Sequence, residues 1–401
     1  MQRMMWLCLV ILMASGFSQV SWAQEKGGPA QTIEVLTHTF RPAQREWTEG
    51  RMRQLQLPDG FRINVFAKGL GNPRMMMVTQ DGTVYMARRD QGEVSALRDR
   101  DGDGVAEEIR TVVRDLPDVH DVTLQGDFFY LVTINELYRA RRQADGGIGS
   151  LQKLIGDLPA GGQHPNRTLK FGPDGMLYLT IGSTCNNCRE PNPEHATMLQ
   201  VQPDGQQRRI FAKGLRNTLG FAWHPKTGEL WGMDHGSDMR GDNVPVEELN
   251  RIVENGDYGW PFCYGQKEVD KLAPDPETGT KEEYCAKTIA PVLGYTAHSA
   301  PMGLVFYTGN QFPAEYRNDA FVAMRGSWNR KPPSGYKVVR VRFQNGQPTR
   351  FEDFITGFLI EGGQAQFARL CGLAVARDGS LLVGDDSNGV IYRVSYRNTN
   401  R

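Results

Sequence analysis

Arginine, histidine and asparagine side chains recur beside short apolar runs in this sequence. A guanidinium group binds a carboxylate through paired hydrogen bonds, and an imidazole can accept a proton near neutral pH. Gathered at one place, such side chains would bind an anion and assist proton transfer. The positions that precede apolar runs are Arg74, His120, His164, Arg216 with Asn217, His298 and Arg369, and those that follow apolar runs are His235, with Gly236 and Ser237, and Arg325.

These positions belong to a repeated pattern. A polar lead-in is followed by a short apolar run, a Gly-containing turn and a second apolar run, which together predict a β-hairpin. The pattern begins at Asn72, Asp118, His164, Arg216, Ser299 and Ala368. Six units at or above the length of a four-stranded blade predict an all-β fold, a six-bladed β-propeller with a central channel. The lead-ins would converge at one end of that channel.

The channel is expected to hold an anion, because several cations and imidazoles around an empty channel would repel one another. The alternative for each residue is a solvated polar group that only lines the channel. Helical periodicity is nearly absent, and residues 244–253, VPVEELNRIV, are the segment that we predict as a short helix. The methionines at 75–77 fit the inner strand of their blade.

The first 23 residues have the pattern of a secretory signal peptide. Arg3 precedes an apolar stretch from Met4 to Met13, and Ser21 and Ala23 are small residues around a cleavage point. No later run approaches the roughly 18 apolar residues that a membrane span requires. We therefore predict a periplasmic or secreted protein, cut after Ala23, with an N-terminal extension at 24–56 and the propeller domain at 57–401.

The charge balance argues against a polyanionic partner. The chain has 46 basic and 46 acidic residues and a pI of about 7.1. General attraction to nucleic acid or to anionic lipid is not expected at that balance. A small, locally recognised ligand fits better.

The cysteines predict two disulfides in an oxidising compartment. Cys8 lies in the signal peptide, Cys185 and Cys188 form a CNNC motif, and Cys263 and Cys285 flank a polar loop, which leaves Cys371 unpaired. Other pairings stay open at this point. A redox role for CNNC would require a βαβ setting that the sequence does not indicate, so we interpret it as a structural clip.

An acidic loop is a second candidate metal site. In DRDGDGVAEE, residues 99–108, the carboxylates of Asp99, Asp101 and Asp103 alternate and Gly104 stands at the turn, as in the first half of a calcium loop. The twelfth position is Arg110, so the loop is not a complete EF-hand. Structural calcium and a solvated turn both remain possible interpretations.

Four blocks carry a family resemblance: GLRNTLGFAWHPKTGELWGMDHG, NRIVENGDYGWPFC, HPNRTLKFGPDGMLYLTIGS and MRGSWNRKPPSGYKVVRV. They resemble the soluble sugar dehydrogenases that depend on pyrroloquinoline quinone (PQQ), most closely the L-sorbosone or pyranose dehydrogenase branch. The resemblance extends from about Leu57 to Tyr396. It implies oxidation of an aldose or sugar aldehyde with PQQ and Ca²⁺, and transfer of the electrons to a separate acceptor.

The resemblance also implies roles for individual residues. His164 would be the catalytic base, and Arg216 would stabilise the negative charge that develops on oxygen. Backbone oxygens of Gly236 and Ser237 would hold calcium at the quinone. The remaining PQQ contacts would come from Arg216, Asn217, His120, His235, Arg325 and Arg369.

The sequence departs from the glucose-oxidising branch at several positions. Ser237 stands where that branch has proline, His120 stands where it has amides, and HPNR replaces a more polar lead-in around His164. These differences leave the sugar open. Two other functions stay as alternatives: a non-catalytic extracellular propeller that binds a glycan or a protein, and a calcium-dependent lactonase, which would need acidic and amide side chains in the channel.

Overall fold

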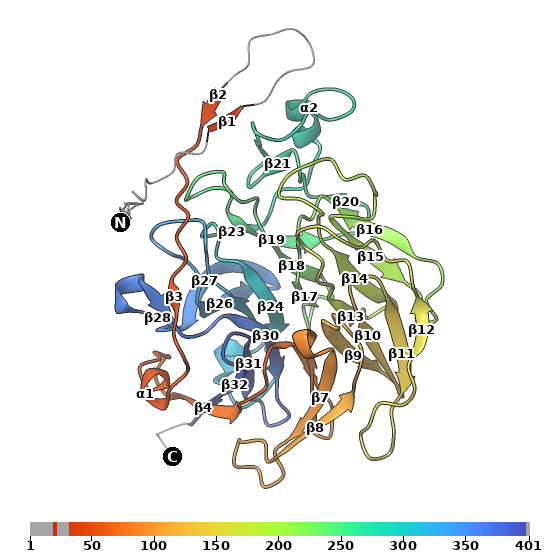
Figure 1. The fold of residues 1–401 in the computed structure, drawn as a ribbon, viewed down its shortest axis with the longest axis vertical. Helices are drawn as coiled ribbons and strands as arrows, with labels where there is room; N and C mark the ends of the chain where they lie inside the picture. The colour runs from red at the N-terminus through yellow and green to blue at the C-terminus, as the bar shows by residue number, and fades with distance from the viewer. Residues whose placement is uncertain (1–18, 22–31, 398–401) are drawn as a thin grey trace, which may run out of the picture.

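The structure is a computed structural model that describes residues 19–21 and 32–397 (Figure 1). Strands dominate these residues. Their α-helices are α1 (Glu49–Met52) and α2 (Lys281–Ala286). The predicted all-β class is therefore confirmed. Most of the predicted signal peptide, including its cleavage point after Ala23, lies outside the described residues.

Six antiparallel sheets follow one another along the chain. The first contains β5 (Pro73–Val78), β6 (Val84–Arg88), β7 (Glu93–Arg98) and β8 (Glu108–Val113). The second contains β9 (Asp121–Gln125), β10 (Phe128–Val132), β11 (Leu137–Arg141) and β12 (Gln152–Ile155). The third contains β13 (Leu169–Phe171), β14 (Leu177–Ile181), β15 (Thr197–Val201) and β16 (Arg209–Lys213), with β20 (Gly256–Asp257) added parallel to β16.

The remaining three sheets come from the second half of the chain and one early strand. The fourth contains β17 (Gly220–Trp223), β18 (Leu230–Asp234), β19 (Glu247–Ile252) and β23 (Leu293–Tyr295). The fifth contains β24 (Pro301–Phe306), β25 (Ala320–Met324), β26 (Lys337–Gln344) and β27 (Gln347–Ile355). The sixth contains β30 (Leu370–Val375), β31 (Leu381–Asp385), β32 (Val390–Tyr396) and β4 (Phe61–Ala67).

Both ends of the described chain meet in the sixth sheet. Strand β4 pairs antiparallel with β32, with Ala67 opposite Ile391 and Phe61 opposite Tyr396 (Figure 1). Residues from opposite ends of the chain thus share one hydrogen-bonded ladder.

The first strands of neighbouring sheets lie against one another. Strand β5 contacts β9 and β30, β9 contacts β13, and β24 contacts β17 and β30. Glycines permit this approach. A Cβ atom at Gly220 would lie 2.1 Å from the Met302 carbonyl oxygen, and one at Gly303 would lie 2.7 Å from that of Cys371.

The hydrophobic core is divided among the interfaces between sheets. One cluster joins Tyr85 and Val94 of the first sheet to Phe129 and Leu131 of the second. The rings of Tyr85 and Phe129 have centroids 4.6 Å apart. Residues 75–77 lie in β5, with Met75 and Met76 buried, so the predicted core strand is confirmed.

The helix predicted at 244–253 is wrong, because residues 247–252 of this segment form strand β19. Glu247 and Glu248 point to opposite faces of the strand, and both are buried. The Glu247 carboxylate accepts hydrogen bonds from the backbone N–H groups of Gly236 and Ala300, and that of Glu248 accepts one from Gly265. Glutamate is a residue type usually found exposed, so the sequence pattern does not show that Glu247 and Glu248 are both buried in a strand.

The segment before β4 follows the outside of the sheets. Strand β3 (Ala43–Gln44) pairs parallel with β29 (Ala365–Gln366), which in turn pairs with β28 (Leu359–Ile360). The imidazole Nδ1 of His38 lies 2.6 Å from a carboxylate oxygen of Asp242. Short pairs also join β1 (Gln19–Ser21) to β2 (Thr32–Glu34) and β21 (Cys263–Tyr264) to β22 (Glu268–Val269).

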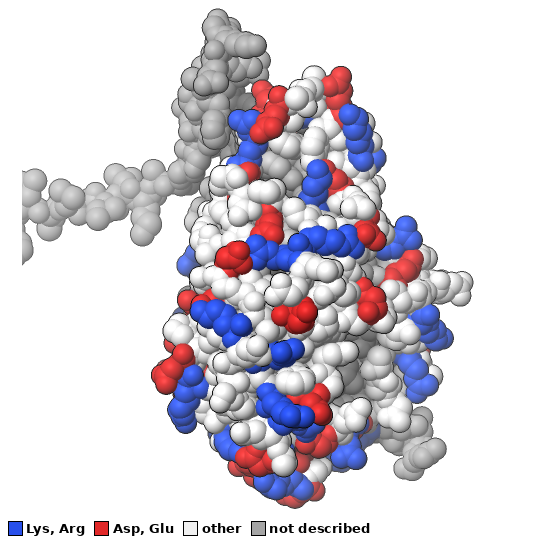
Figure 2. All heavy atoms as spheres, turned by 90° about the vertical axis from the view of Figure 1, so that its right-hand side faces the viewer, with Lys and Arg blue, Asp and Glu red and all other residues white. Residues whose placement is uncertain are grey.

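Charges of both signs are interspersed on the face that Figure 2 presents, which agrees with the neutral composition. Within the described residues, no helix has the length and apolar character needed to cross a membrane.

Candidate functional site

A polar cavity of about 340 Å³ lies where the ends of several sheets meet. Residues before β5, β13 and β17 contribute to its wall, as do residues after β18 and β25. Of the predicted site residues, four line it: Arg74, Asn217, His235 and Arg325. The other wall residues are Asn72, Arg89, Asp90, Asn166, Leu219 and Met302.

Asp386 joins two of the cavity arginines. One of its carboxylate oxygens accepts hydrogen bonds from both Arg74 and Arg325. The other oxygen is buried and has no partner among the described residues. The sequence argument for an anion counted the cations and overlooked this carboxylate, so part of the positive charge is already offset.

His120 lies behind Arg74. It is buried, its Nδ1–H donates to the carbonyl of Arg167 over 2.7 Å, and its Nε2 accepts from Arg74 over 3.1 Å. Burial and the charge of Arg74 lower its pKa well below the ordinary value. With both ring nitrogens used, His120 orients Arg74 and does not face the cavity.

Arg369 keeps most of its hydrogen-bonding capacity. Its Nη2 donates to the carbonyl of Gly326 over 3.0 Å, while its buried Nε lacks a partner among the described residues. Burial and the nearby charge of Arg325 lower its pKa to about 10.

Arg216 is almost completely bound within the protein. Its Nε and Nη2 donate to the carbonyl and the side-chain oxygen of Asn186, its Nη1 donates to the carbonyl of Gly236, and its Nη2 also binds Asp238. These are four of the five donors that a guanidinium carries. The side chain is 2% exposed. Arg216 is thus a fixed charge with little freedom to reorient.

His235 and Asn217 form one polar pair on the cavity wall. Nε2–H of His235 donates to the carbonyl of Pro301, and its Nδ1 accepts from the Asn217 amide over 3.4 Å. Burial, and then the charge of Arg216, lower the His235 pKa to about 4. Asp234 holds the turn before β17 by accepting from the backbone N–H groups of Arg216 and Asn217, and burial raises its pKa to about 6.

His164 differs from the other predicted site histidines because one ring nitrogen remains free. Nδ1 lies 2.8 Å from Ser183 Oγ and 3.2 Å from the Ser183 carbonyl. The Ser183 hydroxyl donates to the carbonyl of Cys185 over 2.8 Å, so it can only accept from the histidine. Nδ1 therefore carries the proton, and Nε2 has a lone pair with no hydrogen-bond partner among the described residues.

The His164 pKa is lowered to about 2 by burial and by the charges of Arg216 and His235. The imidazole is therefore neutral at neutral pH. Gly182 separates it from the cavity wall: a Cβ atom there would lie 2.5 Å from the His164 Cβ and 3.0 Å from Oδ1 of Asn217. His164 and the cavity residue Asn217 are thus both close neighbours of Gly182, and His164 itself is not among the cavity-lining residues.

The strand-end residues Gly236 and Ser237 follow His235. The Gly236 carbonyl accepts from Arg216, and its N–H donates to Glu247. Burial raises the Glu247 pKa to about 8. His298 lies between β23 and β24 and contacts this loop, since its Nε2–H donates to the Gly241 carbonyl and its Nδ1 accepts from Asn329.

The acidic loop brings four carboxylates together. Ligand atoms of Asp99, Asp101, Asp103 and Glu107 lie within 4.8 Å of one another. Glu107 was not part of the predicted set. Within the loop, Asp99 accepts from the N–H groups of Gly102 and Gly104.

Both predicted disulfides are present, Cys185–Cys188 and Cys263–Cys285, and Cys371 is a buried free cysteine. The CNNC motif lies in the connection between β14 and β15, without a helix after it. A structural clip therefore fits better than a thioredoxin-like motif.

Sequence reasoning missed Asp386, Ser183 and Asn186. Asp386 directly follows β31 as His235 directly follows β18, and Ser183 is the second residue after β14, so both lie just past the second strand of a sheet. A polar residue just past the second strand of a repeat is the sequence signal that would have pointed to Asp386 and Ser183.

Comparison with known proteins gives the family. A protein from Borreliella burgdorferi described as uncharacterised is 29% identical over 85% of this chain and 91% of its own length. The PQQ-dependent pyranose dehydrogenase of Coprinopsis cinerea is 24% identical over 84% of this chain, which spans about half (54%) of that protein. A calcium structure of the Trichoderma reesei carbohydrate-active family AA12 enzyme superposes with a TM-score of 0.74 at 20% identity, over 86% of this chain and 97% of that one, which shows a shared fold. The profile of the TrAA12-like family matches residues 55–397, and this chain belongs to that family.

Proposed function

We propose that this protein is a PQQ-dependent sugar dehydrogenase that oxidises an aldose or a sugar aldehyde of the pyranose or sorbosone type. The observation that carries the proposal is the neutral His164, whose Nε2 has no hydrogen-bond partner among the described residues and whose Cβ is a close neighbour of Gly182, as is the cavity residue Asn217. The dependence of a family relative on PQQ supports it.

The proposed architecture is a six-bladed β-propeller formed by residues 57–401 after an extension at 24–56. Its blades would be the six sheets, and the cavity would lie at one end of the central channel. The support is that the wall residues come from equivalent repeat positions in several sheets. Export to the periplasm or the medium follows from the N-terminal pattern of residues 1–23.

The residues around the cavity fit a flat tricarboxylate such as PQQ. Arg325 uses one donor, on Asp386, and Arg369 uses one, on Gly326, so both retain donors for carboxylates. Nε of Arg74 and Nε of Arg369 are buried without partners among the described residues. Arg325, Arg369, Asn217 and His235 would contact the cofactor, with Arg74 held in position by His120.

The proposed calcium site uses the carbonyl oxygen of Ser237 and that of Gly236, which has a second lone pair beside the one that accepts from Arg216. Hard oxygen ligands suit this cation. Asp238, next in the chain, is close enough to bind Arg216 and would add negative charge. Arg216 would act as a fixed positive charge beside the reacting oxygen.

The chain's own part in the reaction is proton transfer and orientation. Nε2 of His164 would take the proton of the sugar C1 hydroxyl, while Nδ1–H stays on Ser183. When bound, PQQ supplies the ortho-quinone that takes the C1 hydride. The two electrons would then leave to a separate acceptor, a carrier protein or a quinone.

Reconstitution tests the proposal. The mature chain is incubated with PQQ and Ca²⁺, and dye reduction is followed with a panel of aldoses and sugar aldehydes, alongside His164→Ala. We expect sugar-dependent reduction that needs both additions and a loss of about 10²- to 10⁴-fold in kcat in the variant. PQQ affinity, measured by absorbance titration, should change little. If PQQ alters neither the absorbance nor the melting temperature, the non-catalytic binding function takes its place.

A further inference from the structure

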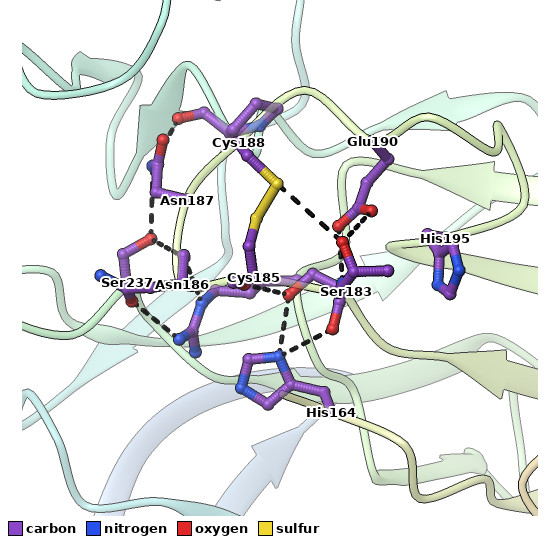
Figure 3. The surroundings of a disulfide bond; sticks show 12 residues. His164, Ser183, Cys185, Asn186, Asn187, Cys188, Glu190, His195 and Ser237 are labelled. Carbon is purple, nitrogen blue, oxygen red and sulfur yellow. Dashed lines mark hydrogen bonds between the residues drawn. A yellow bond between two sulfur atoms is a disulfide. The ribbon is translucent and has the colours of Figure 1, made fainter. Parts of the chain in front are cut away.

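One loop touches both His164 and Arg216. This loop, residues 182–190, is the first part of the connection from β14 to β15, and the Cys185–Cys188 disulfide closes its middle (Figure 3). The two side chains come from different lead-ins, before β13 and before β17. The loop therefore lies between the two groups to which the proposed function gives the proton transfer and the fixed positive charge.

On the histidine side, the contact runs through Ser183. This residue is fully buried, and its backbone N–H donates to the Arg216 carbonyl over 2.8 Å. Its hydroxyl accepts from His164 Nδ1 only because the Cys185 carbonyl takes the hydroxyl proton. The Ser183 carbonyl, 3.2 Å from Nδ1, can likewise only accept, so the Cys185 carbonyl adds, through the Ser183 hydroxyl, to the preference for a proton on Nδ1.

On the arginine side, the contact runs through Asn186. Its carbonyl and side-chain oxygens accept from Nε and Nη2 of Arg216 at 2.9 and 3.0 Å. The same side chain exchanges two hydrogen bonds with the backbone of Asp238, at 2.7 and 3.0 Å. Asn186 therefore holds the guanidinium and the following loop in one arrangement.

The disulfide fixes the two contacts relative to each other. Cys185 supplies the carbonyl that orients Ser183, Asn186 is the next residue, and Cys188 closes the ring two residues later. No regular strand or helix spans the described residues 182–190. Within the ring, Asn187 donates to Asp270 and Pro261, and outside the ring, Glu190 accepts from Thr184.

We propose that Ser183 and Asn186 are positioning residues and that the Cys185–Cys188 disulfide holds them in register, so that one small ring sets both the tautomer of His164 and the direction of Arg216. This inference rests on the proposed function for the consequence to catalysis. The tautomer itself is a property of the PQQ-free chain and can be observed without any turnover.

The experiment measures the His164 tautomer separately from catalysis. In PQQ-free protein labelled with ¹⁵N-histidine, the wild type should show His164 as the Nδ1–H tautomer, with His164→Gln assigning the resonance. Ser183→Ala and the double variant Cys185→Ser/Cys188→Ser should both shift it towards a mixture of tautomers. In the reconstituted enzyme, both should lower kcat about 10- to 100-fold with a PQQ affinity within about threefold of wild type.

Matched variants control for a general loss of structure. Cys263→Ser/Cys285→Ser removes the other disulfide and should leave the His164 tautomer unchanged. Asn186→Asp keeps the acceptor oxygen for Arg216 and should retain more activity than Asn186→Ala. If Cys185→Ser/Cys188→Ser fails to fold, Ser183→Ala, Asn186→Asp and Asn186→Ala still test the inference.

Two results would overturn the inference: an unchanged tautomer in both Ser183→Ala and the double cysteine variant, or equal losses in Asn186→Asp and Asn186→Ala. A wild-type chain that shows the Nδ1–H tautomer but no sugar oxidation would remove the proposed function and leave the positioning of His164 standing.

Discussion

Gly372 in β30 lies against the backbone of Arg74 in β5, so that a Cβ atom on the glycine would be 2.3 Å from the Arg74 carbonyl oxygen. Backbone atoms cannot yield as the end of a flexible side chain can. This contact joins the last sheet to the first and sets the position of a cavity arginine. Because the contact is so close, a side chain added at Gly372 should destabilise the folded protein.

Gly372→Ala should lower the free energy of unfolding by about 2–3 kcal/mol, because the added methyl group must separate two strands. Urea unfolding of both proteins measures this. Gly50→Ala is the matched control, since the nearest atom to a Cβ there is 4.0 Å away in a short helix. Equal losses in the two variants would contradict the explanation.

Glu248 predicts a stability that depends on pH. Burial, with the nearby charge of Asp234, raises its pKa to about 8. The folded protein therefore holds this proton at pH values where the unfolded chain releases it, and the stability contributed at low pH is lost as pH rises from the ordinary glutamate pKa towards 8.

Glu248→Gln should remove this loss. A glutamine amide could donate to the Asn250 side-chain oxygen, which is buried without a partner among the described residues. Relative to wild type, the variant should gain roughly 1–3 kcal/mol between pH 5 and pH 8. Urea unfolding at both pH values tests this, with the exposed Glu282→Gln as the control. A constant difference across pH would argue against a raised pKa.

Arg325→Gln should weaken PQQ binding about 10- to 100-fold, because it removes a charged donor from the cavity wall and leaves Asp386 without one of its two partners. Absorbance titration with PQQ measures the change. Arg350→Gln, on a side chain that is 60% exposed, serves as the control and should bind normally. Unaltered affinity in Arg325→Gln would exclude this arginine from the cofactor site.

Cys371 should resist thiol reagents in the folded protein. It is fully buried, and burial raises its pKa to about 11, so the reactive thiolate is scarce. The mature chain should show almost no reaction with Ellman's reagent until it is unfolded, and then one thiol. Cys371→Ser should show none in either state. Rapid reaction in the native state would mean that β30 opens.

Most strands and the charged residues of the candidate site could be predicted from the sequence. The hydrogen-bond partners of those residues could not. His164, Arg216 and Arg325 were found because each recurs at a fixed place beside an apolar run. The Ser183 side chain acts on the lead-in of its own sheet and Asn186 acts on Arg216 and Asp238 of the next sheet, and no spacing within the chain reports such contacts. The same limit explains 244–253, where buried Glu247 and Glu248 read as exposed positions of a helix until their backbone partners are known.

The pairing of β4 with β32 also has a consequence for synthesis. Strand β4 precedes the other strands of the six sheets in the chain, whereas its partner, Val390–Tyr396, is made after all of them. Contacts between such distant segments form slowly, since the whole intervening chain must first be brought together. Until then β4 has no neighbour and the sixth sheet keeps an open edge, so a chain stalled before Val390 would be prone to pair with other chains.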